Sequence, residues 1–121
     1  MIMVSTSLIL MIIGKVMIDI SPGEINKLMG YRTKKSMMNQ KNWDVGQKYS
    51  SHFMYKIFGL FLPCSIPFMI FDGLSLFGVF TDFWFILSLI LQTGIILLGL
   101  SLIFYFTEKK IILFMNNEEK A

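Results

Sequence analysis

The chain has 121 residues, of which 55% are hydrophobic and only 16% are charged, with a formal net charge of +3. Its mean hydropathy of +0.64 excludes an ordinary soluble domain of this length, which would need polar residues to cover its core. We therefore predict one membrane domain over residues 1–121, an all-α protein with three transmembrane helices. Ten lysines, one arginine and a single alanine are typical of an AT-rich bacterial genome, so we expect a bacterial cytoplasmic membrane.

The first predicted span covers about residues 1–19 and is interrupted by Lys15. A membrane-spanning helix needs about 20 apolar residues, so this span is short and Lys15 must extend its ammonium group to the membrane surface. Asp19 follows one helical turn later, a spacing that allows an ion pair with Lys15. No basic residue precedes the apolar part and no cleavage site follows it, so we expect the segment to be retained.

Residues 20–54 form a predicted polar loop in which basic residues greatly outnumber Glu24 and Asp44. Ser21, Pro22 and Glu24 are typical of a helix start, with a serine cap, a proline in the first position and a glutamate three residues after the cap. We expect a short amphipathic helix that rests on the membrane surface and ends at Gly30.

The second predicted span covers about residues 55–72, at the end of a helix that begins near Met38 or Asn39. Pro63 and Pro67 each remove a backbone donor, so we expect this span to be kinked or locally unwound. Asp72 would mark its outer end, and residues 74–80 would form a loop in the outer membrane interface. The spacing predicts one shared face on the helix, made of Trp43, Gly46, Gln47, Ser50, Phe53 and Met54.

The third predicted span covers about residues 83–107 and contains no charged residue. Trp84 and Tyr105 lie near its two ends, where aromatic side chains anchor helices at the membrane surface. We expect an inward-facing set of small or amide residues, namely Gln92, Gly94 and Gly99. Residues 108–121 form a predicted polar tail, with a frayed end from Asn116 onward.

The distribution of basic residues predicts the orientation. Seven lysines and arginines follow the first span, none separates the second span from the third, and three lie in the tail. The positive-inside rule then places the loop 20–54 and the tail in the cytoplasm and the N-terminus outside.

We find no pattern typical of an enzyme active site, a cofactor site or a metal site in the sequence, and expect neither catalysis nor a cofactor. Asp72 and Asp82 are candidates for a cation or proton site, but their positions favour solvated loop ends. Gln92 and Asp72 are candidates for polar contacts inside the membrane. The basic loop favours contact with anionic lipid over nucleic acid, because its charges already serve topology and its aromatic residues show no regular spacing for base stacking.

One stretch of the loop is distinctive, residues 26–49, which read NKLMGYRTKKSMMNQKNWDVGQKY. It resembles the signature of the SdpI family of small bacterial membrane proteins, and the order of spans resembles the C-terminal domain of longer members. Lys34, where the family often has proline, and Gly46-Gln47, where it often has Ala-Asn, depart from the pattern. The matching positions are Asn26, Gly30, Tyr31, Arg32, Thr33, Ser36, Met37, Asn39 and Trp43.

The resemblance implies immunity against a secreted, membrane-active toxin or bacteriocin, and the toxin and the lipid bilayer would be the partners. A first alternative is a signalling receptor that holds a transcriptional repressor at the membrane. A second is a small transporter or channel, which would require a homo-oligomer because three helices enclose little. In the loop, Arg32 either binds an anionic group or only locks the loop to the spans, with Tyr31 and Trp43 as anchors at headgroup depth.

Overall fold

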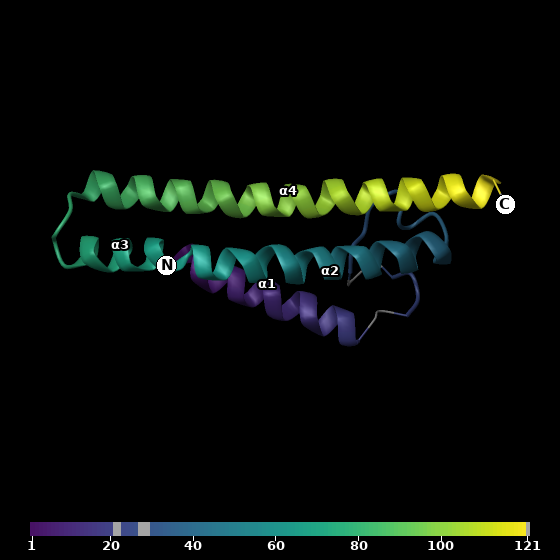
Figure 1. Ribbon diagram of the computed structural model, residues 1–121, viewed down its shortest axis with the longest axis horizontal. Coiled ribbons are helices and arrows are strands. Elements are labelled where there is room, and N and C mark those ends of the chain that lie inside the picture. Colours follow the sequence, from purple (N-terminus) through teal and green to yellow (C-terminus); the bar gives the residue numbers. More distant parts are fainter. Residues whose placement is uncertain (21–22, 27–29, 121) are drawn as a thin grey trace.

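The computed structural model describes residues 1–20, 23–26 and 30–120. The expected all-α architecture is confirmed, and the described residues contain no strand. Helix α4 runs the full length of the molecule, α2 and α3 follow one another alongside it, and α1 lies against α2 (Figure 1). The described helices are α1 (Ile2–Asp19), α2 (Gln40–Cys64), α3 (Ile66–Leu76) and α4 (Asp82–Lys120).

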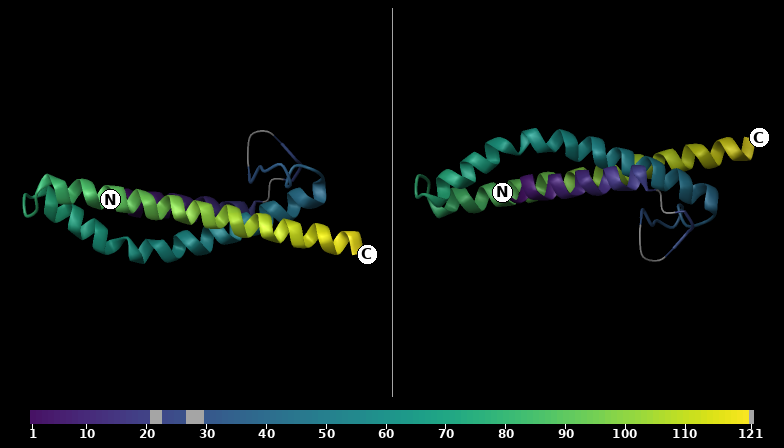
Figure 2. Two further views of the ribbon diagram at one scale, coloured as in Figure 1. Left: turned by 90° about the horizontal axis from the view of Figure 1, so that it is seen from above. Right: turned by 90° about the horizontal axis from the view of Figure 1, so that it is seen from below.

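Helices α2 and α3 form one bent unit, whose halves meet at Ser65 at an angle of 46°. The bend arises because Pro63 in the last turn of α2 and Pro67 in the first turn of α3 have no N–H to donate. The buried hydroxyl of Ser65 donates to the carbonyl of Leu62 at 2.5 Å, which satisfies an acceptor at the break. The predicted kink is confirmed, and Figure 2 shows the unit arching beside α4.

Glycines allow helices to approach closely at two places. A Cβ atom at Gly14 of α1 would lie only 2.8 Å from the backbone nitrogen of Tyr55 in α2. A Cβ atom at Gly99 of α4 would lie 2.6 Å from the ring of Phe61. Gly99 therefore faces another helix as expected, whereas Gly94 is exposed and its inward orientation was a wrong prediction. The buried apolar core joins three helices through Met3, Phe58, Ile96 and Ile103.

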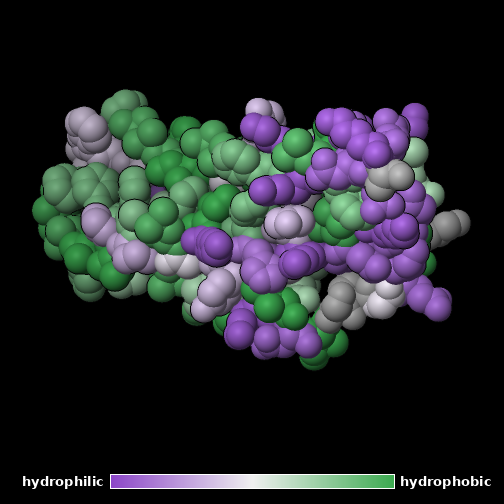
Figure 3. Space-filling model, turned by 45° about the vertical axis from the view of Figure 1, so that its right-hand side comes forward, coloured by the Kyte–Doolittle hydropathy of each residue, from purple (hydrophilic) through white to green (hydrophobic). Residues whose placement is uncertain are grey.

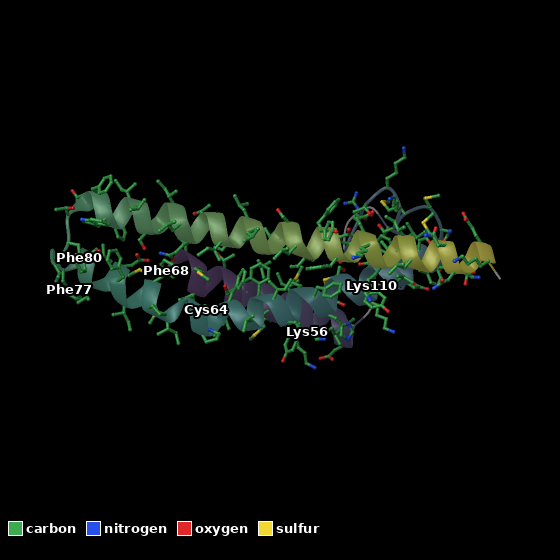
Figure 4. All side chains as sticks on the ribbon, turned by 45° about the horizontal axis from the view of Figure 1, so that its top comes forward. Lys56, Cys64, Phe68, Phe77, Phe80 and Lys110 are labelled. Carbon is green, nitrogen blue, oxygen red and sulfur yellow. The ribbon has the colours of Figure 1, made fainter. Side chains whose placement is uncertain are left out.

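Apolar and polar surfaces are separated along the long axis. Figure 3 shows hydrophobic side chains over the end that holds α3 and the start of α4, and hydrophilic ones over the end near the C-terminus. We call these the apolar end and the basic end; Phe77 and Phe80 lie at the former and Lys110 lies towards the latter (Figure 4). By length and composition α1 and α4 can each cross a membrane, and α2 with α3 makes a third candidate.

The start and the inner face of α2 agree with the sequence predictions. Asn39 caps the helix, because its side-chain oxygen accepts a hydrogen bond from the Asn42 N–H at 2.8 Å. Of the predicted face, Phe53 and Met54 are half-buried and the others are fully buried, namely Trp43, Gly46, Gln47 and Ser50.

Two predicted helix ends were wrong. Helix α4 continues to Lys120, where the sequence indicated a frayed tail from Asn116 onward. Its last turns are supported by α2, since the side chain of Ile111 is fully buried and lies against Gly46 of that helix. At the apolar end, α3 passes Asp72 and ends at Leu76, so only the second half of the predicted loop 74–80 is non-helical.

The predicted surface helix between Ser21 and Gly30 is also wrong where it is described. Residues 23–26 are not helical, and Gln40 binds two of their backbone groups. Its side-chain amide donates to the carbonyl of Gly23 at 2.6 Å and its oxygen accepts from the Ile25 N–H at 3.3 Å. Residues 21–22 and 27–29, which carry the rest of that prediction, lie outside the described residues.

Candidate functional site: the signature loop and a buried polar cluster

The signature loop is held against α2 by the side-chain amide of Gln47. The Gln47 oxygen Oε1 accepts a hydrogen bond from the Tyr31 N–H at 2.7 Å, and Nε2 donates to the Tyr31 carbonyl at 2.6 Å. One amide therefore satisfies both backbone groups of a loop residue. Gly30 permits this approach, because its φ is +100° and a Cβ atom there would clash with Gln47 Oε1.

A compact turn follows, centred on the fully buried Ser36. The Ser36 hydroxyl oxygen accepts from the Thr33 N–H at 2.8 Å, and the Ser36 N–H donates to Thr33 Oγ1 at 3.2 Å. The Ser36 hydroxyl also lies within hydrogen-bonding distance of the carbonyls of Tyr31 and Thr33. Asn42 adds a bond from its side-chain amide to the carbonyl of Lys35 at 3.1 Å. The turn is therefore organised by side chains that bind nearby backbone groups.

Tyr31 connects the loop to α4. Its hydroxyl donates to Glu108 Oε1 at 2.8 Å, and its ring lies 6.1 Å from that of Phe104. Burial raises the pKa of the Tyr31 hydroxyl, and the neighbouring Glu108 carboxylate raises it further, so the hydroxyl remains a donor. Trp43 is fully buried, so its predicted role as an anchor among lipid headgroups is wrong.

Two further polar side chains of the signature have different surroundings. Asn26 is half-buried, and its side-chain amide donates to the carbonyl of Glu24 at 3.1 Å. Arg32 is exposed at the basic end and makes no hydrogen bond or ion pair with residues 1–20, 23–26 or 30–120. The structure thus brings most of the signature together as a folded loop and leaves the Arg32 side chain exposed.

A second polar site lies between α1, α3 and α4, in the apolar half of the molecule. Its centre is Asp72, which is fully buried. The carboxylate accepts from Ser88 Oγ at 2.7 Å, from Gln92 Nε2 at 2.7 Å and from the amino group of Met1 at 2.5 Å. The prediction that Asp72 is a solvated loop end is therefore wrong, whereas Asp82 is exposed at the start of α4.

Gln92 joins the three helices in this cluster. Its Oε1 accepts from the Met3 N–H at 3.1 Å and from the Met1 amino group at 3.1 Å, while its Nε2 binds Asp72 and Ser88. The Gln92 side chain of α4 therefore caps the first turn of α1, where the backbone N–H groups have no acceptor within their own helix. The predicted contact of Gln92 with other helices is confirmed.

The sequence did not predict the polar contacts of three residues in these sites. Ser88 precedes Gln92 by four residues in an otherwise apolar run, a spacing that places both on one helix face and was a usable signal. Gln47 was grouped with the inner face of α2, but nothing in the sequence indicated that it binds the loop backbone. Glu108 follows directly on the third predicted span and gave no sign of its contact with Tyr31.

An apolar groove opens between α3 and α4 beside the cluster. Its volume is about 370 Å³, and Ser88, which binds Asp72, forms part of its wall. Phe68, one of its lining residues, also packs against the buried apolar core. The other lining residues are all apolar, namely Pro67, Phe71, Trp84, Leu87 and Leu91.

Long apolar helices with exposed aliphatic and aromatic side chains define an all-helical membrane protein. Residues 23–106 match the SdpI/YfhL protein family, which is well over half of the chain, so the protein belongs to that family. Comparisons with curated proteins and with solved structures gave no match. The family is known for immunity-type membrane proteins.

The matched region covers the signature loop, α2, α3 and α4 as far as Phe106. The resemblance found in the sequence is therefore confirmed at the level of the family. Which external molecules the individual signature residues bind stays a prediction, and the positions of these residues in the structure limit what each can contact.

Proposed function

We propose that the protein protects its producer cell from a secreted, membrane-active toxin. Membership of the SdpI/YfhL family carries this proposal, since that family is known for immunity-type membrane proteins. The groove between α3 and α4 supplies a surface at which a toxin inside the membrane would be bound.

The proposal includes three spans, with α2 and α3 together forming the second. Counting back from Glu108 on α4, a hydrocarbon core of about 30 Å reaches approximately Ser88, at about 1.5 Å per residue. Lysines and arginines cluster at the basic end, which we therefore place in the cytoplasm, with the N-terminus on the outer side. The Asp72 cluster then lies near the outer boundary of the core.

This depth suits contact with a toxin that arrives from outside. The groove faces the membrane from the outer half and is lined almost entirely by apolar side chains, which match an apolar helix face. Behind it, the hydrogen bonds of Asp72 hold α3 at a fixed position relative to α4. We propose that toxin binding here keeps the peptide from assembling into its lethal form.

The experiment fills the groove without disturbing the core. Leu91 lines the groove and Ile90 does not, yet both are strongly exposed on the same turn of α4, at 52% and 62%. The wild type, Leu91→Trp and Ile90→Trp are expressed at equal membrane levels in a strain that lacks the gene. The cells are challenged with concentrated culture supernatant of the producing strain, and survival is counted.

We expect the wild type and Ile90→Trp to protect, and Leu91→Trp to lose at least about tenfold in protection, as the loss of about 1.4 kcal/mol of binding implies. Equal protection by the two variants would move the binding surface away from the groove. If wild-type cells survive no better than cells without the gene, the immunity function itself is wrong.

A further inference from the structure

A pocket of about 410 Å³ opens at the basic end between the signature loop and three helices. Its polar lining includes Arg32 and Thr33 of the loop and the buried Ser50 of α2. Its apolar wall includes Ile13 of α1 and Ile103 of α4. Volumes of about 300–1,000 Å³ are usual for small-molecule sites, so the pocket is large enough for a ligand with a polar and an apolar part.

Among the described residues that line the pocket, Arg32 carries the only charge. Arg32 has no carboxylate partner in the described ranges, and the nearby Glu108 carboxylate is bound to the Tyr31 hydroxyl. A guanidinium is permanently charged and presents several N–H donors in a planar arrangement that matches phosphate oxygens. The side chain is therefore available to an anionic group from outside the protein.

The pocket also lies at a definite depth. Ile13 and Ser50 are adjacent to the close contact between Gly14 and Ser51, and Lys15 follows directly with its exposed ammonium group. On α4 the charged stretch begins at Glu108, about one turn beyond the lining residue Phe104. Apolar lining thus gives way to charged residues at the level of the pocket, which is the depth of lipid headgroups in the proposed topology.

We propose that this pocket is a binding site for an anionic phospholipid of the cytoplasmic leaflet, with the lipid phosphate on Arg32 and the start of an acyl chain against the apolar wall. Charge complementarity with the unpaired guanidinium selects an anionic headgroup. The apolar wall selects a lipid over free phosphate, which would leave that wall exposed to water. The site is distinct from the groove at the apolar end and does not depend on the immunity function.

The test compares lipid retention by variants that remove one positive charge each. The protein is purified in a neutral detergent and titrated with dioleoyl phosphatidylglycerol or dioleoyl phosphatidylcholine, and bound lipid is counted by native mass spectrometry. Arg32→Gln removes the proposed ligand of the phosphate. Lys34→Gln is the matched control, because Lys34 is exposed two residues further along the same loop and does not line the pocket.

We expect the wild type to prefer phosphatidylglycerol and Arg32→Gln to bind it about tenfold more weakly, a change equal to about 1.4 kcal/mol. Lys34→Gln should change the affinity less than about twofold, and Arg32→Lys should fall between, since an ammonium makes no bidentate contact. Equal losses in Arg32→Gln and Lys34→Gln would indicate only a general basic surface and overturn the proposal.

Two further outcomes would also overturn it. The first is an unchanged affinity in Arg32→Gln with an unchanged circular dichroism spectrum. The second is displacement of the lipid by inorganic phosphate, which would show that the pocket takes a soluble anion. Because Arg32 is exposed and has no described bonds, we expect Arg32→Gln to fold as the wild type does.

Discussion

The two ends of the molecule use buried polar groups in different ways. At the apolar end, Gln92 of α4 binds the Asp72 carboxylate of α3 and the Met3 N–H of α1, so that side chains and backbone of three helices are joined. At the basic end, Ser36 binds the backbone of Thr33 within its own turn, and Gln47 of α2 binds the backbone of Tyr31 in the loop. One arrangement connects helices, and the other shapes a loop.

This difference has energetic consequences. A side-chain cluster in an apolar surrounding loses several bonds when one member is removed, and no water replaces them. The backbone groups that Gln47 binds belong to Tyr31, a half-buried residue at the basic end, where water can replace a lost partner. We therefore expect variants at the apolar end to cost more stability than variants at the basic end.

Gln92→Leu tests the apolar end and has the largest expected effect. The change leaves the Met3 N–H without its acceptor and removes a donor from Asp72, so we expect the free energy of unfolding to fall by about 2–3 kcal/mol. Thr93→Val is the control, because the exposed Thr93 hydroxyl binds only the Leu89 carbonyl of its own helix. Steric trapping in lipid bicelles measures the free energy of unfolding of both variants. Similar losses would mean that the polar cluster does not stabilise the fold more than a single exposed hydroxyl does.

Gly30→Ala tests the shape of the signature loop. A φ of +100° is strained for alanine, and the added Cβ would displace the Gln47 oxygen, so we expect a loss of about 2 kcal/mol. Gly23→Ala is the control, since a Cβ atom there meets nothing within 4 Å. The Tyr31 N–H donates to Gln47, so the rate of hydrogen exchange at this amide measures directly whether the loop keeps its shape. Normal protection of that amide in Gly30→Ala would contradict the arrangement.

The sequence predicted the parts of this structure that depend on local rules. Helix periodicity, the start of the second helix near Asn39 and the proline kink follow from spacing and backbone chemistry, and all three are confirmed. The signature loop was recognisable as a motif because its residues are close together in sequence. The burial of Asp72 could not be predicted in this way, because it depends on how three helices are placed in space.

The error at the end of α4 has the same origin. Fraying from Asn116 onward was predicted because polar chain ends are commonly poorly ordered unless other contacts hold them. The helix persists because α2 lies alongside, with Ile111 buried at Gly46 and Lys41 paired with Glu118. Contacts between distant segments override local preference at both ends of the molecule.

Tyr31→Phe tests the link between the loop and α4. It removes only the hydroxyl that binds Glu108, so we expect a loss of about 1 kcal/mol. The matched control is Tyr105→Phe, because Tyr105 is 59% exposed and its hydroxyl has no hydrogen-bond partner among the described residues. The same bicelle measurement compares the two variants, and a larger loss for Tyr105→Phe would reverse our assignment of the contact.

Lys41→Gln has the smallest expected effect and tests whether the last turns of α4 need their surface ion pair. Lys41 and Glu118 are 72% and 50% exposed and 3.1 Å apart, so water and salt weaken the attraction. We expect a loss below about 0.5 kcal/mol that vanishes near 1 M salt. Lys109→Gln, which removes an exposed cation of α4, is the control in the same unfolding measurement. A loss above about 1 kcal/mol from Lys41→Gln would mean that charge, not the burial of Ile111, holds the end of α4 on α2.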